Sequence, residues 1–492
     1  MSDVRRERWR VRIALGLVIF VAAALRLTGL HYSLWNDEVA SVEFAKVPVR
    51  LLWSDWMIRE TNPPLYYTVL HGWMMAVGNG DGHLRLLTAL IGCLDILLVF
   101  ALGRRVGGAW TGTIAAALVA LSAQNILYSQ QVRAYILADA GAVAAITGAI
   151  VFLDAVHRPT GDGRRAGGLA LYLGGAAVAI YSHTTLLLLP ALTGVFVLAR
   201  LVLPASRAVR PVEEWIATNA LLLLAAAWWV RITILQAETR STIGWIATPS
   251  LPYAIRMTLE SFLPWQIGPA QYLVAVLATA AAAWGTWQWR DRPDYLLLPF
   301  LAVGLPVLLY AASIKVPMFL DRTVYWASAP FLVTVAAGIA RLQPRGVAIG
   351  AAGIAVVASV AGWATWFPAR ETEPWQDIAE SLDRQYPGMT VLTQGIGPTL
   401  ALRRYCRPPG CSLRIIGVRS PSIDTWASGF SVPGMVGKHE AADILKRRGS
   451  IVAIRWMAAD PMAMPPPTAL ARPIVIGYGH ADNIGATLWR VR

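Results

Sequence analysis

Charged side chains, cysteines and the short motifs of several enzyme classes are scarce in this chain of 492 residues. Asp, Glu, Lys and Arg make up 15% of the residues and hydrophobic residues 56%, a balance outside the range of soluble globular domains. The chain has no glycine-rich phosphate loop, no DxD or HExxH motif and no convincing Ser-His-Asp order. Chemistry built on those motifs is therefore excluded, and a reaction would have to use a carboxylate and cations.

Positive charge is in excess, with a formal net charge of +14, but it forms no basic block interleaved with aromatic residues. Nucleic-acid binding is therefore not expected. The arginines instead fall in short loops between apolar runs, as the orientation of membrane helices requires. Many of the 21 tryptophans lie at the ends of those runs, as in the aromatic belts of membrane proteins.

The apolar runs are about 17 to 25 residues long, enough to cross a hydrocarbon core of roughly 30 Å. Arginines among the first twelve residues predict a cytoplasmic N-terminus, and the first apolar run lacks a cleavage site, so we expect it to be retained as a span. At least two arginines recur in every second connection, which supports about eleven transmembrane helices. These are predicted at residues 13–30, 84–103, 110–128, 135–154, 169–203 (two spans), 215–235, 270–289, 296–313, 324–340 and 347–366.

The chain divides into a transmembrane domain, residues 1–366, and an extracytoplasmic domain, residues 367–492, whose composition is mixed polar and apolar. Periodicity predicts a helix at 375–386 and strands at 390–393, 450–456 and 473–478, so the C-terminal domain should be a small α/β domain. Cys406 and Cys411 flank a Pro-Pro-Gly turn and are disulfide candidates in an oxidising compartment. Without further Cys or His at ligand spacing, a zinc site is not expected.

Asp37 and Glu38 are the first candidates for chemistry, in the predicted external loop 31–83 between the first two spans. They follow Trp35 a few residues beyond a span. A charged side chain so close to the low-dielectric membrane costs free energy, so a charge without a function is not expected there. A carboxylate there can act as a general base that takes a proton from an attacking hydroxyl. The structural alternative is a solvated loop pair, or a charge favoured at the start of a helix.

Arg133, Lys315 and Arg322 are predicted at the outer membrane face, where the usual charge bias disfavours cations. One interpretation is a clamp for a lipid phosphate, because the arginine fork fits phosphate oxygens. The other is an ion pair with nearby acids, or snorkelling to headgroups. His183, at the tight turn between two spans, could bind phosphate or cap a helix.

The sequence Asn62-Pro63-Pro64-Leu65-Tyr66-Tyr67 predicts a stiff turn that starts an amphipathic helix at residues 65–77, lying along the membrane surface. Asn62, Tyr66, Tyr67 and His71 are candidates for a sugar pocket. The aromatic residues could equally anchor this helix at the interface.

Taken in order, several short motifs resemble those of the polytopic GT-C glycosyltransferases, in particular the family 39-like group that includes protein O-mannosyltransferases and aminoarabinose lipid A transferase. The resemblance covers about residues 1–366, and each motif is weak alone. The motifs are Trp35-Asn36-Asp37-Glu38, Asn62-Pro63-Pro64-Leu65-Tyr66-Tyr67, His83-Leu84-Arg85-Leu86, Gly103-Arg104-Arg105, Tyr128-Ser129-Gln130-Gln131-Val132-Arg133-Ala134-Tyr135, Ser182-His183, and Lys315-Val316-Pro317 followed by Arg322.

The resemblance implies a catalytic Asp at Asp37 and a polyprenyl-phosphate sugar donor held by Arg133 and Arg322, with Lys315 as a further partner. It implies an inverting glycosyltransferase with a hydroxyl acceptor on a lipid, glycan or protein. Two departures affect the donor contacts: an acidic residue is expected before Arg133, where the chain has Gln130-Gln131, and a tyrosine after Arg322, where it has Thr323.

The sequence predicts no particular cofactor, and it leaves open whether a divalent cation takes part in the reaction. The expected location is the inner (plasma) membrane of a bacterium, with many spans, a cytoplasmic N-terminus and an extracytoplasmic C-terminal domain.

Two other functions are considered. A transporter or flippase of lipid-linked sugars would also need external cations, but should show broken helices and charges near mid-membrane. Asp95 and Asp139 lie within predicted spans and keep this alternative open. A structural membrane protein whose C-terminal domain recruits partners is the other, and the grouping of carboxylates and cations argues against it.

Overall fold

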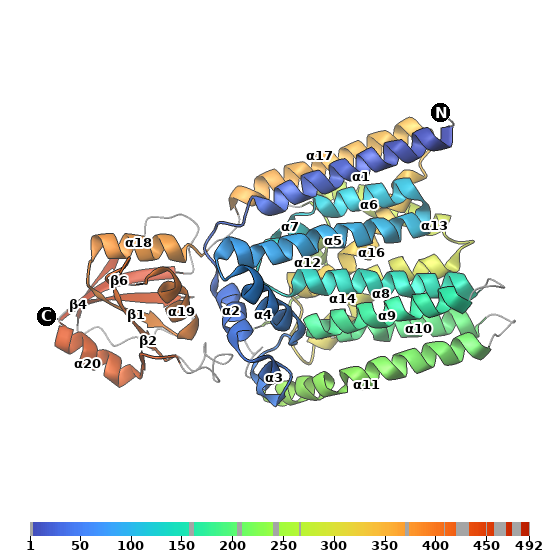
Figure 1. Ribbon diagram of the computed structural model, residues 1–492. Coiled ribbons are helices and arrows are strands. Elements are labelled where there is room, and N and C mark those ends of the chain that lie inside the picture. The colour runs from blue at the N-terminus through green and yellow to red at the C-terminus, as the bar shows by residue number, and fades with distance from the viewer. Residues whose placement is uncertain are drawn as a thin grey trace. The chain divides into compact units, whose positions relative to one another are not determined.

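The computed structural model divides into two compact units, each described here by itself (Figure 1). The helical unit comprises Met1–Leu30, Thr61–Val77 and His83–Pro368, and the α/β unit comprises His31–Glu60, Gly78–Gly82 and Ala369–Arg492. The structure describes residues 3–156, 162–203, 209–239, 246–264, 267–369, 373–407, 409–419, 432–448, 450–456, 469–474 and 484–491.

Seven described helices are long and apolar enough to cross a membrane, judged by length and composition. An eighth span results if α6 (Ala109–Ala120) and α7 (Ala123–Ser129), which meet at a bend of 67°, count as one. The chain is therefore a multi-pass membrane protein, as predicted. The seven segments are Asp81–Gly107, Tyr135–Val156, Thr184–Val202, Val209–Glu238, Pro293–Ser313, Asp321–Ala340 and Arg345–Phe367.

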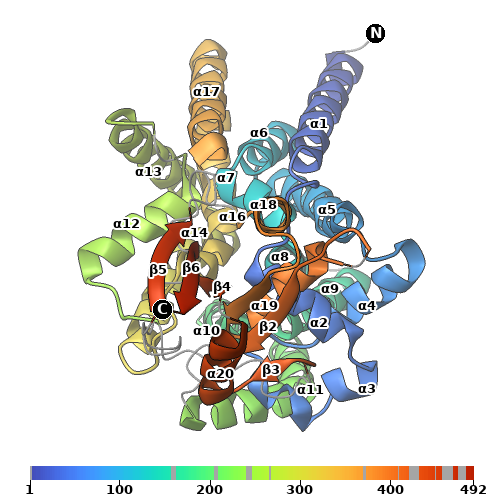
Figure 2. The same ribbon diagram turned by 90° about the vertical axis from the view of Figure 1, so that its left-hand side faces the viewer.

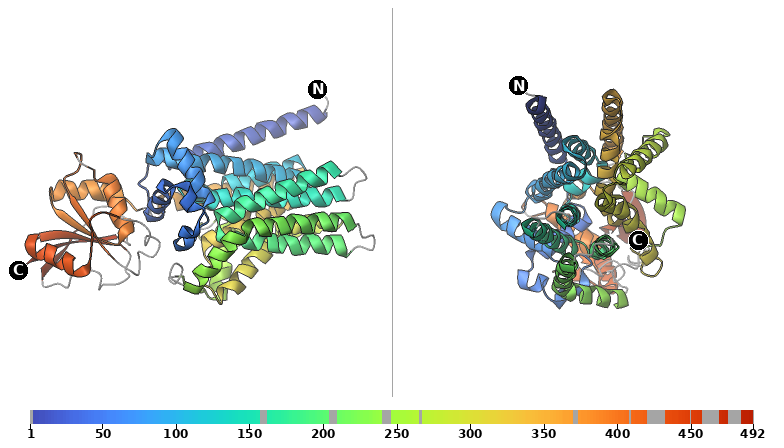
Figure 3. Two further views of the ribbon diagram at one scale, coloured as in Figure 1. Left: turned by 60° about the horizontal axis from the view of Figure 1, so that its bottom comes forward. Right: turned by 90° about the vertical axis from the view of Figure 1, so that its right-hand side faces the viewer.

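Each of the eleven predicted spans coincides with one helix or with two or three consecutive helices, and these run alongside one another as a bundle (Figures 1 and 3). Three of them, α1, α9 and α13, are not among the seven segments, because they carry more charge or a less apolar stretch. The elements are α1 (Asp3–Leu27), α5 (Asp81–Gly107), α6 (Ala109–Ala120) with α7 (Ala123–Ser129), α8 (Tyr135–Val156), α9 (Asp162–Ser182), η2 (Thr184–Leu187) with α10 (Leu188–Val202), α11 (Val209–Thr239), α13 (Ala270–Gln288), η3 (Pro293–Leu296) with α14 (Leu297–Ser313), α15 (Asp321–Val324) with η4 (Tyr325–Ala327) and α16 (Ser328–Ala340), and α17 (Arg345–Ala369).

Helices α8 and α9 form the most extensive helix–helix interface of the helical unit. Their glycines bring backbone against backbone: a Cβ atom on Gly148 would collide with Tyr172 N and Gly168 O, and one on Gly175 with Ala145 N. Small residues allow this close approach of membrane helices, where lipid supplies no hydrophobic driving force. The interface makes α8 and α9 a rigid pair, whose ends carry residues of the candidate site.

The α/β unit contains a six-stranded sheet in the order β3-β2-β1-β4-β6-β5 (Figure 2). The first four strands in chain order pair in parallel, and β6 pairs antiparallel with both β4 and β5. The elements are α18 (Trp375–Gln385), β1 (Thr390–Gln394), α19 (Ile396–Tyr405), β2 (Arg414–Val418), β3 (Met435–Val436), α20 (Lys438–Arg448), β4 (Ser450–Trp456), β5 (Ala469–Ile474) and β6 (Ile484–Val491).

The predicted helix at 375–386 and the strands at 390–393 and 450–456 occur where they are expected. The third predicted strand, 473–478, overlaps only the end of β5, and its residues 475–478 lie outside the described residues. A disulfide bond joins Cys406 and Cys411 directly after α19.

The first loop after α1 groups with the C-terminal sheet rather than with the spans. Its helices α2 (Asn36–Lys46), α3 (Val49–Leu52) and η1 (Asp55–Arg59) belong to the α/β unit. This loop is predicted to belong to the transmembrane domain 1–366, so the compact units divide the chain differently. Helix α4 (Leu65–Val77) has the predicted bounds and belongs to the helical unit.

Substitution of Gly175 by valine should destabilise the helical unit, because the added side chain would collide with the backbone of α8. The free energy of unfolding should fall by about 1–3 kcal/mol or more, the range typical of overpacking. The neighbouring Gly174, on the same helix, has open space around its Cα, so Gly174→Val is the matched control. Size-exclusion yield and the thermal unfolding midpoint in detergent measure the effect. Equal behaviour of the two variants would contradict the backbone contact.

Candidate active site

Polar residues of the helical unit gather where several helices begin or end. Tyr135 starts α8, His183 follows the end of α9, and Thr184 starts η2. Because α8 and α9 are antiparallel neighbours, the start of one lies beside the end of the other (Figure 1). This places His183 and Tyr135 together, with ring centroids 5.8 Å apart.

His183 is buried and held on two sides. Its ring lies 5.0 Å from that of Trp326, which is in η4. The His183 Nδ1 and Thr185 Oγ1 atoms are hydrogen-bonded at 2.9 Å, and Trp326 Nε1 donates to the same Thr185 Oγ1 at 3.0 Å. The imidazole is therefore fixed between the turn that follows α9 and the segment that precedes α16.

Arg133 and Arg322 lie close to this imidazole. Burial, followed by the positive charges of Arg322 and Arg133, lowers the pKa of His183 to about 3. The Arg133 guanidinium carbon lies 5.6 Å from the ring centre of Tyr135, the residue that also faces His183. Three of the four residues predicted for phosphate binding are thus neighbours in the helical unit, although they are far apart in the sequence.

Lys315, the fourth residue, is exposed on the segment after α14. Among the contacts of the described residues, none joins the Lys315 side chain to the other three.

A network of buried polar side chains supports the Arg322 segment. Asn125 Oδ1 accepts a hydrogen bond from Arg26 Nη2, and Asn125 Nδ2 donates to Asp95 Oδ2 at 3.0 Å and to the Tyr325 hydroxyl at 2.6 Å. These residues come from α1, α5, α7 and η4, and η4 directly follows α15, which carries Arg322. Arg26 is fully buried, so its charge requires these partners.

The network lies at the break between α6 and α7. Ser122 caps α7 by accepting from the backbone N–H of Asn125, and Ser129 Oγ accepts from Arg26 Nε at 3.2 Å. A broken helix frees backbone groups, and the polar side chains around the break satisfy them. Asp95 thus has a structural role within its span.

The predicted pocket residues start beside the His183 turn. The Thr184 hydroxyl donates to the carbonyl of Thr61, the residue before Asn62, at 2.6 Å and accepts from Trp229 Nε1 at 3.2 Å. Asn62, Tyr66 and Tyr67 are buried, and the two tyrosine rings meet edge to face at 6.2 Å.

His71, the last predicted pocket residue, is half-buried, one turn further along α4.

Asp37 and Glu38 belong to the α/β unit, in the first turn of α2. Glu38 is fully buried, and its Oε2 atom accepts a hydrogen bond from the backbone N–H of Trp35 at 3.0 Å. This is the role of a glutamate three residues after the N-cap of a helix. Asp37 is half-buried and directly precedes Glu38, the residue that caps the helix.

Several residues of the cluster are absent from the sequence-based candidates. Arg26 could have been found, because it is a lone arginine inside the apolar run 13–30. Thr185 and Trp326 carry no such signal, since a threonine and a tryptophan near a span end are ordinary.

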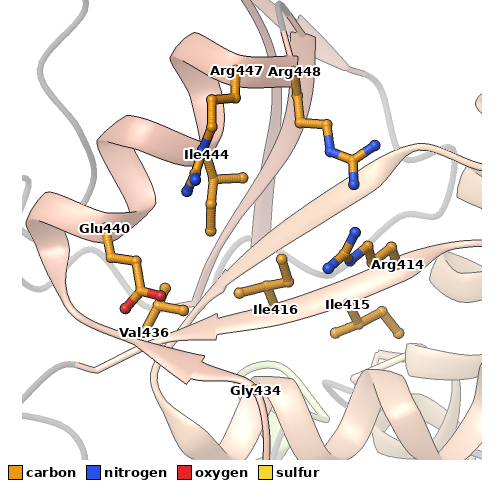
Figure 4. Close-up of a pocket in the computed structure, with 9 residues that line it drawn as sticks. All are labelled: Arg414, Ile415, Ile416, Gly434, Val436, Glu440, Ile444, Arg447 and Arg448. Carbon is orange, nitrogen blue, oxygen red and sulfur yellow. The ribbon is translucent and has the colours of Figure 1, made fainter.

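The α/β unit contains a cavity of about 670 Å³ between β2 and α20 (Figure 4). Ile416 and Val436 line it from the strands and Ile444 lines it from α20, and the side chains of Arg414 and Arg448 face the same space from opposite sides. Its lining residues are Arg414, Ile415, Ile416, Gly434, Val436, Glu440, Ile444, Arg447 and Arg448. Within the described ranges, no group of three or more His, Cys, Asp or Glu side chains is arranged to hold a metal ion.

No family model and no curated protein sequence matches the chain. The fold is similar to that of ArnT from Cupriavidus metallidurans in the apo state, with a TM-score of 0.62 over 96% of this chain and 97% of that chain at 14% identity. ArnT bound to undecaprenyl phosphate gives a TM-score of 0.59 at 15% identity, with the same coverage.

The oligosaccharyltransferase of Archaeoglobus fulgidus, tethered with an acceptor peptide containing the NVT sequon, gives a TM-score of 0.57 at 13% identity, over 91% of this chain and 69% of that chain. These proteins have the GT-C fold, so the predicted GT-C-like fold is confirmed.

The lowered pKa of His183 predicts a dependence of stability on pH. Because the folded pKa is about 3 and the unfolded value 6.5, His183 contributes stability above pH 6.5 that is lost progressively as pH falls toward 3. Between pH 7.5 and 5.0 the unfolding midpoint of the wild type should fall more than that of His183→Asn, which cannot titrate. His31→Asn, which changes an exposed histidine, should follow the wild type. Parallel curves for all three proteins would contradict the burial of a neutral His183.

Proposed function

We propose that the protein is an inverting glycosyltransferase that moves a sugar from a polyprenyl-phosphate donor to a hydroxyl acceptor at the outer face of the membrane. The observation that supports the proposal is that Arg133 and Arg322, far apart in the sequence, both act electrostatically on the buried His183. The fold shared with ArnT, which has been solved with undecaprenyl phosphate bound, supports it.

The donor phosphate binds between the two arginines. Each guanidinium group presents a fork of N–H donors that fits phosphate oxygens, so both arginines can bind the phosphate through charge-assisted hydrogen bonds. A neutral imidazole adds no further positive charge and can offer one N–H to the phosphate. The polyprenyl chain extends from this site into the surrounding lipid.

Asp37 acts as the general base that removes the proton from the acceptor hydroxyl. The hydroxyl oxygen then attacks the anomeric carbon from the face opposite the phosphate, so the configuration inverts. The leaving phosphate needs no general acid, because Arg133 and Arg322 stabilise its negative charge. Glu38 does not share the role of base, since its carboxylate is engaged in the start of α2.

A transporter or flippase of lipid-linked sugars is the second candidate, and the 67° break between α6 and α7 is the observation that favours it. Asp95 argues against a transporter, because its carboxylate accepts a hydrogen bond from Asn125, which also binds Arg26. This acid therefore has a structural role in its span. Purified protein in vesicles with a labelled polyprenyl-phosphate sugar separates the two. Label on an acceptor supports the transferase, and label that only changes leaflet supports the flippase.

The proposed orientation follows from the arginines in alternate connections. The N-terminus is cytoplasmic, and the α/β unit and the site with Arg133, His183 and Arg322 face the outside of a bacterial plasma membrane. Lipids, glycans and proteins all offer hydroxyl acceptors there.

Asp37→Asn should lower kcat by about a hundredfold, because the amide cannot accept the proton of the acceptor. The matched control is Glu38→Gln, whose side-chain carbonyl can still accept from the Trp35 N–H. We expect this control to keep most of the wild-type rate. Transfer of labelled sugar by both variants is the measurement, and wild-type activity of Asp37→Asn would exclude Asp37 as the base.

Arg133→Ala and Arg322→Ala should each weaken binding of undecaprenyl phosphate by about 10- to 100-fold, the value of a charge-assisted hydrogen bond of roughly 1.5–3 kcal/mol. Lys315→Ala removes an exposed cation of the same unit and should change the affinity less than about threefold. Titration of the purified protein with undecaprenyl phosphate measures all three. An effect of Lys315→Ala as large as that of the arginine variants would refute this arrangement of the phosphate site.

A further inference from the structure

The backbone just before α2 is held by a tyrosine of the C-terminal domain. The Tyr405 hydroxyl accepts from the backbone N–H of Leu34 at 2.6 Å and donates its proton to Asp81 Oδ2 at 2.6 Å. All three residues belong to the α/β unit. One hydroxyl thus joins three segments that are far apart in the sequence, and it uses both its proton and a lone pair to do so.

Arg404 completes this contact from the same helix, α19. Its Nε and Nη2 atoms donate to Asp81 Oδ1 at 2.9 and 2.6 Å, and Nη2 also donates to the carbonyl of Asn79 at 2.6 Å. Asp81 is therefore fixed by two neighbouring side chains, Arg404 on one carboxylate oxygen and Tyr405 on the other. Burial raises the pKa of Tyr405, and the hydrogen bond to Asp81 adds to this, so the phenol keeps the proton that it donates.

A second anchor holds the next residues. Glu373 Oε2 accepts from the backbone N–H of Asn36 at 2.8 Å and from Trp375 Nε1 at 2.8 Å. The backbone N–H of Gln376 donates to Ser33 Oγ at 3.1 Å. The chain on both sides of Trp35 is thus bound to the start of α18.

Helix α19 also packs directly on the first residue of α2. Gly397 lies so close to the carboxamide of Asn36 that a Cβ atom at this position would collide with it. The disulfide bond between Cys406 and Cys411 begins one residue after Tyr405 and closes the end of α19. The helix that supplies the anchors is therefore itself held in place.

We infer that Tyr405, Arg404 and Asp81 are positioning residues for the proposed base, so that the C-terminal domain sets the direction of the Asp37 carboxylate. Asp37 follows Asn36 directly and stands three residues after Leu34. The hydrogen bonds of the Leu34 and Asn36 N–H groups therefore fix the backbone that carries the Asp37 side chain. A general base works only within hydrogen-bond reach of the proton that it removes, and small displacements lower the rate steeply. This inference rests on the proposed role of Asp37.

The test is Tyr405→Phe in the full chain, which keeps the ring and removes the hydroxyl. We expect kcat to fall about tenfold, with the KM for the polyprenyl-phosphate sugar and the affinity for undecaprenyl phosphate unchanged within twofold. A residue with only a structural role would not separate kcat from donor binding in this way. Tyr386→Phe is the matched control, because this hydroxyl has no hydrogen bond among the described contacts of the α/β unit.

Hydrogen–deuterium exchange provides a readout that needs no transfer activity. Peptides that cover residues 33–46 should exchange faster in Tyr405→Phe than in the wild type or in Tyr386→Phe. Gly397→Ala, which disturbs the same helix start by collision with Asn36, should have the same two effects.

The outcomes are distinguishable from a failure of the proposed function. If the wild type transfers no sugar, the proposed function fails, and the exchange data alone decide whether the anchors hold α2. If the wild type is active and Tyr405→Phe has the wild-type kcat, or loses donor affinity instead, the inference is overturned. Unchanged exchange of residues 33–46 also overturns it.

Discussion

The helical unit depends on one requirement of the membrane interior, that a buried charge needs polar partners. Asn125 meets this requirement for several helices at once, because its carboxamide accepts from Arg26 and donates to Asp95 and Tyr325. These bonds connect the α6–α7 break to η4, the segment that follows Arg322. A charge inside a span, which could indicate transport, here holds the helix ends that carry the phosphate-binding candidates.

The proposed chemistry divides between the two units. The helical unit carries the cations, Arg133 and Arg322, around a histidine that stays neutral because burial and the cations oppose its protonation. The α/β unit carries Asp37 on the short helix α2, and the backbone at and just before its start is bonded to Glu373, before α18, and to Tyr405 of α19. The first loop is thus supported by residues near the end of the chain, so in the proposed mechanism the C-terminal domain positions the base.

The fold could be predicted from the sequence wherever a local pattern is sufficient to define a helix or a strand. Apolar run length located the helical elements, and periodicity located α4 at Leu65–Val77 and β4 at Ser450–Trp456. Strand β3 was not expected, because two residues carry too little periodicity to read. The adjacent carboxylates look equivalent in sequence, and the structure distinguishes them, because Glu38 is fully buried and accepts a hydrogen bond from the Trp35 N–H.

The sequence by itself determined which segments are helical and apolar, because a membrane helix satisfies its own backbone and needs only enough apolar residues to span the lipid. It also supplied the charged residues that stand out against that background, Asp37, Arg133 and Arg322 among them. Only the tertiary structure decided which of them meet. Lys315 and Arg322 are close in sequence, yet Arg322 lies near His183 while Lys315 is exposed, because helix packing rather than chain distance sets these contacts.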